Sequence, residues 1–155
     1  MTLEMAEILR ISPEEAFDKT KASGYTYVDI RTEPEFADGH PEGAVNVPLG
    51  RIDAGGVVPN EDFLPVMLAL FAKDAKLIVG CKSGRSSMRA TQLLAASGFT
   101  SVIEQRAGWD GARDAFGQLI EPGWLRAGLP TEQGAPSGRC YGDLVAKTQR
   151  SFARS

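Results

Sequence analysis

The chain has 155 residues, 43% of them hydrophobic and 24% charged, and its formal net charge at pH 7 is −3. This length predicts one domain with an ordinary hydrophobic core, and this composition excludes an intrinsically disordered chain. Two cysteines are too few for a disulfide scaffold and one histidine excludes a multi-histidine metal centre, so we expect no metal and no cofactor. The acidic balance disfavours nucleic-acid binding, no stretch approaches the roughly 18 apolar residues of a membrane helix, and the first ten residues lack a signal peptide's apolar run. We therefore expect a cytoplasmic or organellar protein that binds neither nucleic acid nor membrane.

Helix and strand signals alternate through the first part of the chain. Ser12 followed by Pro13 and Glu15 predicts a helix N-terminus with a capping box, and Gly24 ends that helix. The elements expected next are a strand over 25–30, a short helical turn over 32–39 and a short strand over 44–48.

Residues 50–60 contain three glycines and a proline, which predicts a loop. Asn60 can cap the helix that follows, whose apolar residues keep helical spacing: Phe63, Val66, Met67, Leu70 and Phe71.

A short apolar run over 76–80 is typical of a buried parallel strand and leads directly to Cys81. A helix over 88–95 with Gly98 as its C-cap and a strand over 99–103 follow. This alternation predicts an α/β fold: a three-layer sandwich with a mostly parallel central sheet of about five strands flanked by helices.

After residue 122 the pattern weakens. Residues 130–138 are rich in glycine and proline and predict a linker. A terminal helix is expected beyond it, with Tyr141, Leu144, Val145, Thr148 and Phe152 on one face. We expect this helix to pack on its own domain; binding of a partner or a second subunit is the alternative.

Cys81 lies where a buried strand ends and a helix begins, the place where ligands gather in parallel sheets. A glycine-containing loop there can aim several backbone N–H groups at one point, and the helix N-terminus adds positive potential. Lys82 and Arg85 add cations, and hydroxyls come from Ser83, Ser86 and Ser87. The pattern predicts a reactive thiolate that accepts an anionic substrate. The alternative, a small buried hydrophobe, requires neither the glycine nor the cations.

The run Cys81-Lys82-Ser83-Gly84-Arg85-Ser86 resembles the active-site loop of rhodanese-like sulfurtransferases, typically Cys, a basic residue, any residue, Gly, any residue, then Arg, Thr or Ser. Further similar segments occur in family order over residues 8–131: Asp29-Ile30-Arg31, Glu35-Phe36, the run from Gly39-His40 to Pro48, Gly108-Trp109, and Trp124 to Pro130. The chain departs from the family at Ala107-Gly108, where Gly-Gly is usual, and by an apparent insertion near 110–121. The resemblance implies a domain over 1–131 and an extension over 132–155.

The resemblance also implies a function. The Cys81 thiolate would take sulfane sulfur from thiosulfate or a similar donor, and the resulting persulfide would pass it to cyanide, a thiol or a protein acceptor. Residues 82–87 would bind the substrate, with Arg85 expected on the oxyanion because its planar fork matches a sulfonate. Trp109 would be a pocket wall. Asp29, Arg31 and His40 would be structural.

Three alternatives stay open. Phosphatases and arsenate reductases of related topology use Cys-x5-Arg, but the sixth residue after Cys81 is Ser87. A non-catalytic rhodanese-like binding module usually lacks the cysteine, which is present. A persulfide carrier for one specific protein partner would use the same loop. Cys140 is expected to be a peripheral thiol; a resolving or regulatory role is the alternative.

Overall fold

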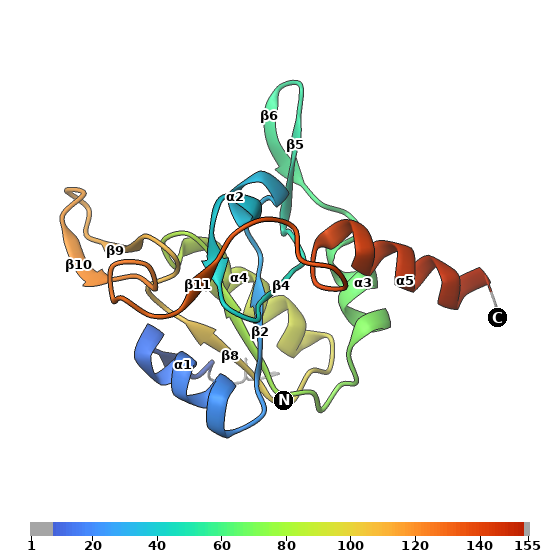
Figure 1. The fold of residues 1–155 in the computed structure, drawn as a ribbon, viewed down its shortest axis with the longest axis horizontal. Coiled ribbons are helices and arrows are strands. Elements are labelled where there is room, and N and C mark those ends of the chain that lie inside the picture. The colour runs from blue at the N-terminus through green and yellow to red at the C-terminus, as the bar shows by residue number, and fades with distance from the viewer. Residues whose placement is uncertain (1–7, 154–155) are drawn as a thin grey trace, which may run out of the picture.

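The computed structural model describes the backbone of residues 8–153 and the side chains of residues 8–148. Its centre is a parallel five-stranded sheet in the order β1-β8-β7-β2-β4 (Figure 1). These strands are β1 (Arg10–Ile11), β8 (Val102–Gln105), β7 (Leu77–Gly80), β2 (Thr26–Asp29) and β4 (Val45–Asn46). The helices are α1 (Pro13–Ala22), α2 (Glu33–Asp38), α3 (Phe63–Leu70), α4 (Arg85–Ala96) and α5 (Tyr141–Ala153). The predicted α/β class and central sheet are confirmed.

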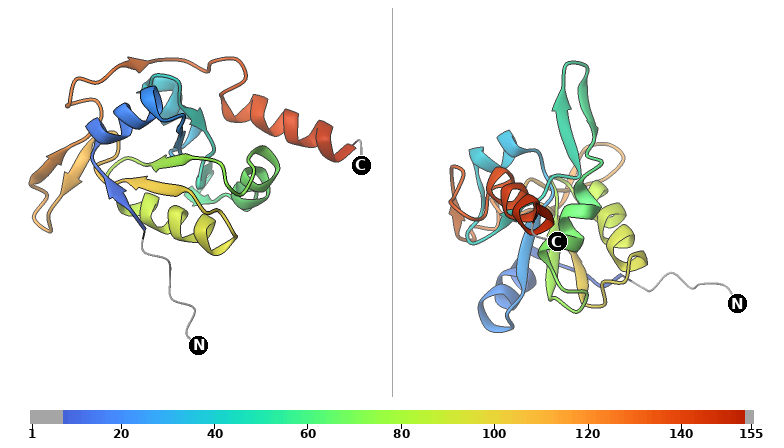
Figure 2. Two further views of the ribbon diagram at one scale, coloured as in Figure 1. Left: turned by 90° about the horizontal axis from the view of Figure 1, so that it is seen from below. Right: turned by 90° about the vertical axis from the view of Figure 1, so that its right-hand side faces the viewer.

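Alternating side chains divide the core between the two faces of the sheet. In β7, Leu77 and Val79 belong to one apolar cluster with α3, α4 and Leu144 of α5, whereas Ile78 belongs to a second cluster with α1 and α2. Because neighbouring residues of a strand point to opposite faces, the continuous apolar run over 77–79 fills both clusters. The result is the expected sandwich of helices, sheet and helices, which Figure 2 shows from two further sides.

Local signals fix the helix starts. Ser12 accepts a hydrogen bond from the backbone of Glu15, whose carboxylate accepts one from the backbone of Ser12, as the sequence predicts. Thr32 and Glu35 form a second capping box at α2. The helix expected after Asn60 begins only at Phe63; the side-chain oxygen of Asn60 accepts a hydrogen bond from the backbone of Asp62, and its amide nitrogen donates to the carbonyl of Pro48.

The prediction of a loop over 50–60 is wrong. Gly50–Asp53 forms β5 and Gly56–Pro59 forms β6, an antiparallel hairpin that projects from the body of the domain (Figure 1). Ile52 lies opposite Val57 in the hairpin, and Gly56 adopts a φ of +118° at the turn. The glycines therefore supply the turn of a hairpin instead of disrupting the segment.

The strand expected over 99–103 lies later, at Val102–Gln105. Phe99 is buried in the core before the strand begins, and the strand continues through the polar residues Glu104 and Gln105. Both polar side chains are fully buried, because each finds hydrogen-bond partners at the site described below.

The remaining strands pair two by two. β9 (Gly111–Arg113) and β10 (Leu119–Pro122) form a hairpin within the segment expected as an insertion, and β3 (His40–Pro41) pairs with β11 (Thr131–Glu132). The terminal helix packs on its own domain, since Tyr141, Leu144 and Val145 contact the apolar cluster of α3 and α4. The side chain of Phe152 lies outside the described residues. The division after residue 131 stays a prediction.

Glu132 ties the segment before α5 to the domain. Its carboxylate accepts hydrogen bonds from the guanidinium of Arg139 and the backbone of Gly43, and lies 3.1 Å from Nε2 of buried His40. The hydrogen bond from Arg139, with smaller contributions from Gly43 and His40, lowers the pKa of Glu132 to about 2.

This pKa predicts a stability that depends on pH. The folded-state pKa lies below the ordinary value of 4.5, so the contribution of Glu132 is complete above pH 4.5 and is lost as the pH falls toward 2. We expect Glu132→Gln to lower the free energy of unfolding at pH 7 by about 2 kcal/mol, allowing for partial solvent screening. The difference from the wild type should shrink below pH 4.5 in urea titrations. Glu14→Gln on the exposed face of α1 is the control, and a difference independent of pH would contradict the assignment.

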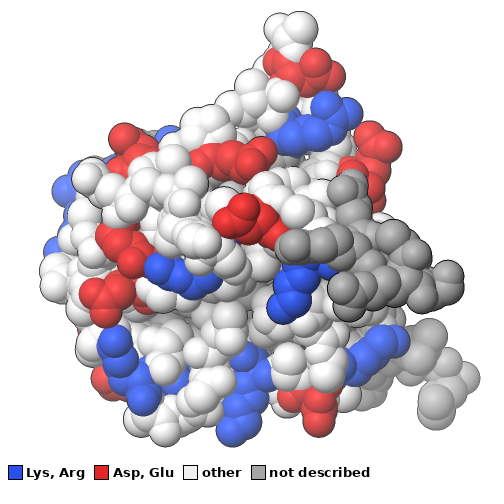
Figure 3. All heavy atoms as spheres, turned by 45° about the vertical axis from the view of Figure 1, so that its right-hand side comes forward, with Lys and Arg blue, Asp and Glu red and all other residues white. Residues whose placement is uncertain are grey.

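Charges of both signs are interspersed on the face shown in Figure 3. Within residues 8–153, no helix combines the length and apolar character needed to cross a membrane.

Candidate active site

Cys81 immediately follows β7 at the carboxyl end of the parallel sheet. Gly80 pairs with Asp29 of β2, and the Gly80 carbonyl accepts a hydrogen bond from the backbone of Ile30. The ends of β2 and β7 therefore lie side by side, so residues 30–32 become neighbours of the cysteine loop. This is the edge of a parallel sheet at which ligands bind.

The loop turns sharply around the thiol. Cys81 is 6% exposed, and the backbone N–H of Gly84 donates to its Sγ at 3.0 Å. Gly84 has a φ of +87° and directly precedes α4, so the helix N-terminus begins beside the sulfur. A hydrogen-bond donor and a helix N-terminus both stabilise a thiolate.

A second turn, residues 107–110, holds the loop from behind. The backbone of Trp109 donates to the Cys81 carbonyl and that of Asp110 to the Lys82 carbonyl, each at 2.8 Å. A Cβ on Gly108 would lie 2.5 Å from the Cys81 carbonyl oxygen, so this approach requires glycine. The single glycine of Ala107-Gly108 is the one that touches the loop.

Gln105 fixes this turn from the end of β8. Its amide oxygen accepts from the backbones of Ala107 and Gly108, and its amide nitrogen donates to the hydroxyl of Tyr27 at 3.1 Å. Burial, together with the charge of Asp29, raises the pKa of Tyr27 far above its ordinary value, so the hydroxyl stays neutral. Sequence reasoning missed Gln105, because a glutamine in an apolar strand carries no motif.

Ser87, expected on the substrate, faces the sheet instead. Its hydroxyl is fully buried and donates to Glu104 at 2.6 Å, and Glu104 also pairs with Arg10. This arrangement attaches the first turn of α4 to β8 and β1, and supports a structural role for Ser87.

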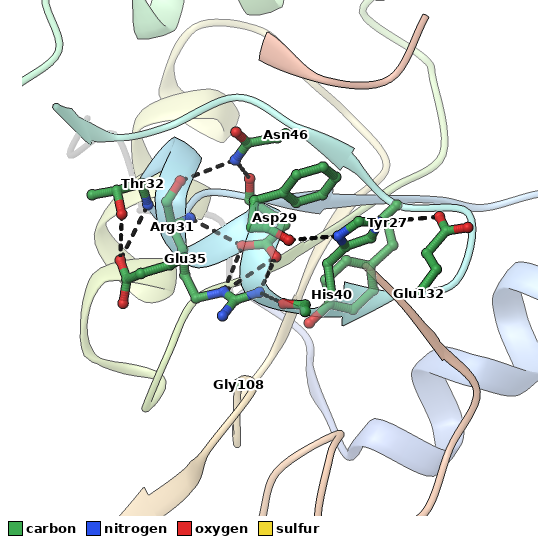
Figure 4. A network of polar contacts seen from close by, with 12 residues as sticks. Tyr27, Asp29, Arg31, Thr32, Glu35, His40, Asn46, Gly108 and Glu132 are labelled. Carbon is green, nitrogen blue, oxygen red and sulfur yellow. Dashed lines mark hydrogen bonds and ion pairs between the residues drawn. The ribbon is translucent and has the colours of Figure 1, made fainter. Parts of the chain in front are cut away.

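Asp29 and Arg31 form a buried ion pair (Figure 4). The guanidinium of Arg31 donates to both carboxylate oxygens of Asp29, the shortest bond being 2.7 Å, and lies over the ring of Trp109 at 4.8 Å. Burial is the largest single influence and opposes the charge of Arg31, but the hydrogen bonds that Arg31 donates to Asp29 and the negative charge of Asp29 together outweigh burial, so the pKa of Arg31 is raised. This placement supports the structural role expected for both residues.

His40 is also buried in the framework. Its Nδ1 lies 2.6 Å from the carbonyl of Phe36, and its ring stacks on that of Phe36. With Nε2 directed at Glu132 (Figure 4), neither ring nitrogen faces Cys81, which supports a structural role.

A cavity of about 590 Å³ opens beside Cys81. The cysteine loop contributes Cys81, Lys82 and Ser86 to its lining. Ser83, Gly84, Arg85 and Ser87 do not line it, and neither does Trp109, expected as a wall. Arg85, expected on the oxyanion, is solvent-exposed and outside the lining, whereas Arg31 and Arg89 both line the cavity.

The periodicity of α4 explains this difference. Ser86, Arg89 and Leu93 lie three and four residues apart, on the helix face that borders the cavity, whereas Ser87, Ala90, Thr91 and Leu94 are buried against the domain. Ser87 lies one position from Ser86, which turns it away from the cavity, and Arg85, the first residue of α4, lies outside the lining. Extending the helical spacing outward from Ser86 would have identified Arg89.

The fold and this loop define a class: single-domain α/β proteins with a cysteine at a strand end, cradled by a loop that leads into a helix. Residues 12–115 match the family model described as "Rhodanese-like domain", and the chain belongs to this family.

Named relatives agree with this assignment. The chain is 37% identical to "Thiosulfate sulfurtransferase 16, chloroplastic" of Arabidopsis thaliana over 110 residues, which cover 71% of this chain and 82% of the relative. It is 33% identical to "Thiosulfate sulfurtransferase GlpE" of Pseudomonas putida over 106 residues, covering 68% and 86%. Among solved structures, Rv0390 from M. tuberculosis is similar with a TM-score of 0.66 and 27% identity, covering 81% of this chain and 97% of that one.

Proposed function

We propose that this protein is a sulfurtransferase that moves sulfane sulfur from thiosulfate or a similar anion to a thiol or cyanide, through a persulfide on Cys81. The observation that carries the proposal is the Gly84 N–H on the Cys81 sulfur at the N-terminus of α4. The names of the relatives support sulfurtransferase activity in general.

The first half-reaction loads the enzyme. The Cys81 thiolate attacks the outer sulfur of thiosulfate, the sulfur–sulfur bond of the donor breaks, and sulfite leaves with the bonding electron pair. Lys82 and Ser86 line the cavity beside the thiol, so we assign the sulfonate contact to them instead of Arg85. Lys82 has only a long 3.9 Å ion pair with Asp110 and is largely exposed, so its charge remains available to the anion.

The second half-reaction discharges the persulfide. An acceptor nucleophile takes the outer sulfur, and Cys81 leaves as the thiolate that began the cycle. Such covalent catalysis predicts ping-pong kinetics. It requires reduced cysteines, so we propose a cytoplasmic or organellar compartment.

The buried position of Ser87 disfavours the phosphatase alternative. A Cys-x5-Arg loop needs a guanidinium at that position, whereas here the side chain is enclosed against Glu104.

The test is intact mass spectrometry after incubation with thiosulfate, followed by peptide mapping. We expect the mass of a single added sulfur, located on Cys81 and removed by cyanide. If no donor leaves a sulfur adduct and an aryl phosphate is hydrolysed instead, the proposal is wrong.

A further inference from the structure

The cavity beside Cys81 is much larger than its smallest substrates require. At about 590 Å³ it lies in the range of pockets that enclose organic ligands, whereas thiosulfate has five heavy atoms and cyanide two. Its walls come from the β5–β6 hairpin and α3, which follow one another along the chain, and from α4, which lies further along it.

One wall of the cavity is apolar. The residues that form it are Leu49, Val57, Val58, Phe63, Leu64 and Leu93. Val57 on the hairpin is 69% exposed and Leu93 on α4 is 38% exposed. When an apolar ligand covers apolar side chains that are exposed to water at a cavity, the burial of that surface stabilises the complex.

The charges along the lining are unbalanced. Arg31 is neutralised by Asp29, Glu35 belongs to the capping box of Thr32, and Glu61 lies 3.4 Å from Arg51. Among residues with described side chains, Arg89 has neither an ion pair nor a hydrogen bond and is exposed at the cavity. Its position one helical turn from Ser86 allows it to meet the far end of a molecule whose near end lies at the thiol.

We infer that the acceptor of the Cys81 persulfide is an organic thiol with an extended apolar body and an anionic group. The apolar body would lie on the apolar wall of the cavity, and the anionic group would pair with Arg89. This inference rests on the proposed function and names its second substrate. Deprotonated by solvent, the acceptor thiol attacks the outer sulfur of the persulfide. One sulfur–sulfur bond forms on the acceptor, the bond to Cys81 breaks, and Cys81 departs as a thiolate.

The experiment isolates the discharge step. Enzyme is loaded with thiosulfate, freed of donor, and mixed with mercaptoethanol, mercaptohexanol or mercaptohexanoate, and loss of the persulfide is followed by quenched mass spectrometry. Rates are divided by those of the same thiols with a small-molecule trisulfide, which corrects for intrinsic reactivity. We expect mercaptohexanol to exceed mercaptoethanol roughly tenfold, because four methylenes are partly buried, and mercaptohexanoate to exceed mercaptohexanol several-fold.

Two variants test which residue causes each increase in rate. Val57→Thr keeps the shape of the side chain and should reduce the advantage of both long thiols, while Arg89→Gln should abolish only the advantage of the carboxylate. Matched controls lie on the β9–β10 hairpin, away from the cavity: Ile120→Thr, at a residue 67% exposed, and Arg113→Gln should change neither ratio.

The outcomes separate the two claims. If no persulfide forms, the proposed function itself fails. If the persulfide forms and cyanide discharges it, but the corrected rates of the three thiols are equal, the inference about the acceptor is overturned while the proposed function stands. The inference about the acceptor would also be overturned if the two control variants on the β9–β10 hairpin reduced the rate ratios as much as Val57→Thr and Arg89→Gln do.

Discussion

Cys81→Ser should abolish sulfur transfer from thiosulfate, with a fall in kcat/KM of roughly a thousandfold or more. The serine hydroxyl is a much poorer nucleophile than a thiolate and cannot hold the outer sulfur in a sulfur–sulfur bond. The variant should still fold, because serine is slightly smaller than cysteine and its oxygen can accept the Gly84 N–H. Steady-state thiosulfate:cyanide assays and thermal unfolding measure the two effects separately.

Cys140→Ser is the matched control. Cys140 lies just before α5 and is partly buried, and its backbone N–H bonds to Pro136 instead of to the active-site loop. We expect its activity and persulfide lifetime to equal those of the wild type. Residual transfer in Cys81→Ser that disappears only when Cys140 is also replaced would assign the sulfur to the second cysteine.

Gly84→Ala should both destabilise the protein and inactivate it. At a φ of +87° an added Cβ is strained, and it would lie 2.0 Å from the carbonyl oxygen of Arg106. Because that oxygen belongs to the backbone, the cysteine loop must move away from the turn over 107–110. We expect a loss of about 2–4 kcal/mol in the free energy of unfolding and a fall in kcat/KM of roughly a hundredfold.

Gly24→Ala separates the two causes. Gly24 has a φ of +73°, but nothing lies within 4 Å of the position of its Cβ. This variant should cost only about 1 kcal/mol and leave activity intact. If both alanine variants lose the same free energy of unfolding in urea titrations, the overlap with Arg106 contributes nothing to the loss in Gly84→Ala. The close packing of the two turns would then not determine the shape of the cysteine loop.

The chain sequence was sufficient to locate the elements whose signals are local. Ser12 and Thr32 start helices with their own capping boxes, and the apolar run over 77–79 is a buried strand. The hairpin over 50–59 was not predictable as such. Its side chains are mostly exposed, so no apolar alternation distinguished it from a loop, and its pairing depends on the turn.

The same distinction applies to the candidate site. Cys81 and its loop are contiguous, so their residue types alone indicated a thiolate beside an anion site. The direction of each side chain was decided by how α4 packs. Its burial against the domain turns Ser87 toward Glu104 and brings Arg89 to the cavity, in place of the expected Arg85.

What the sequence by itself determined was the α/β class, the family resemblance and the cysteine at a strand end, because each depends on neighbours along the chain. Only the tertiary structure decided what surrounds that cysteine. Three separate segments surround it: the stretch from Gln105 to the turn at Gly108, the β5–β6 hairpin, and the part of α4 that carries Arg89. Parallel strands whose carboxyl ends meet at one edge bring these segments together. The acceptor cavity is therefore a property of the packing, since no single segment of the chain contains it.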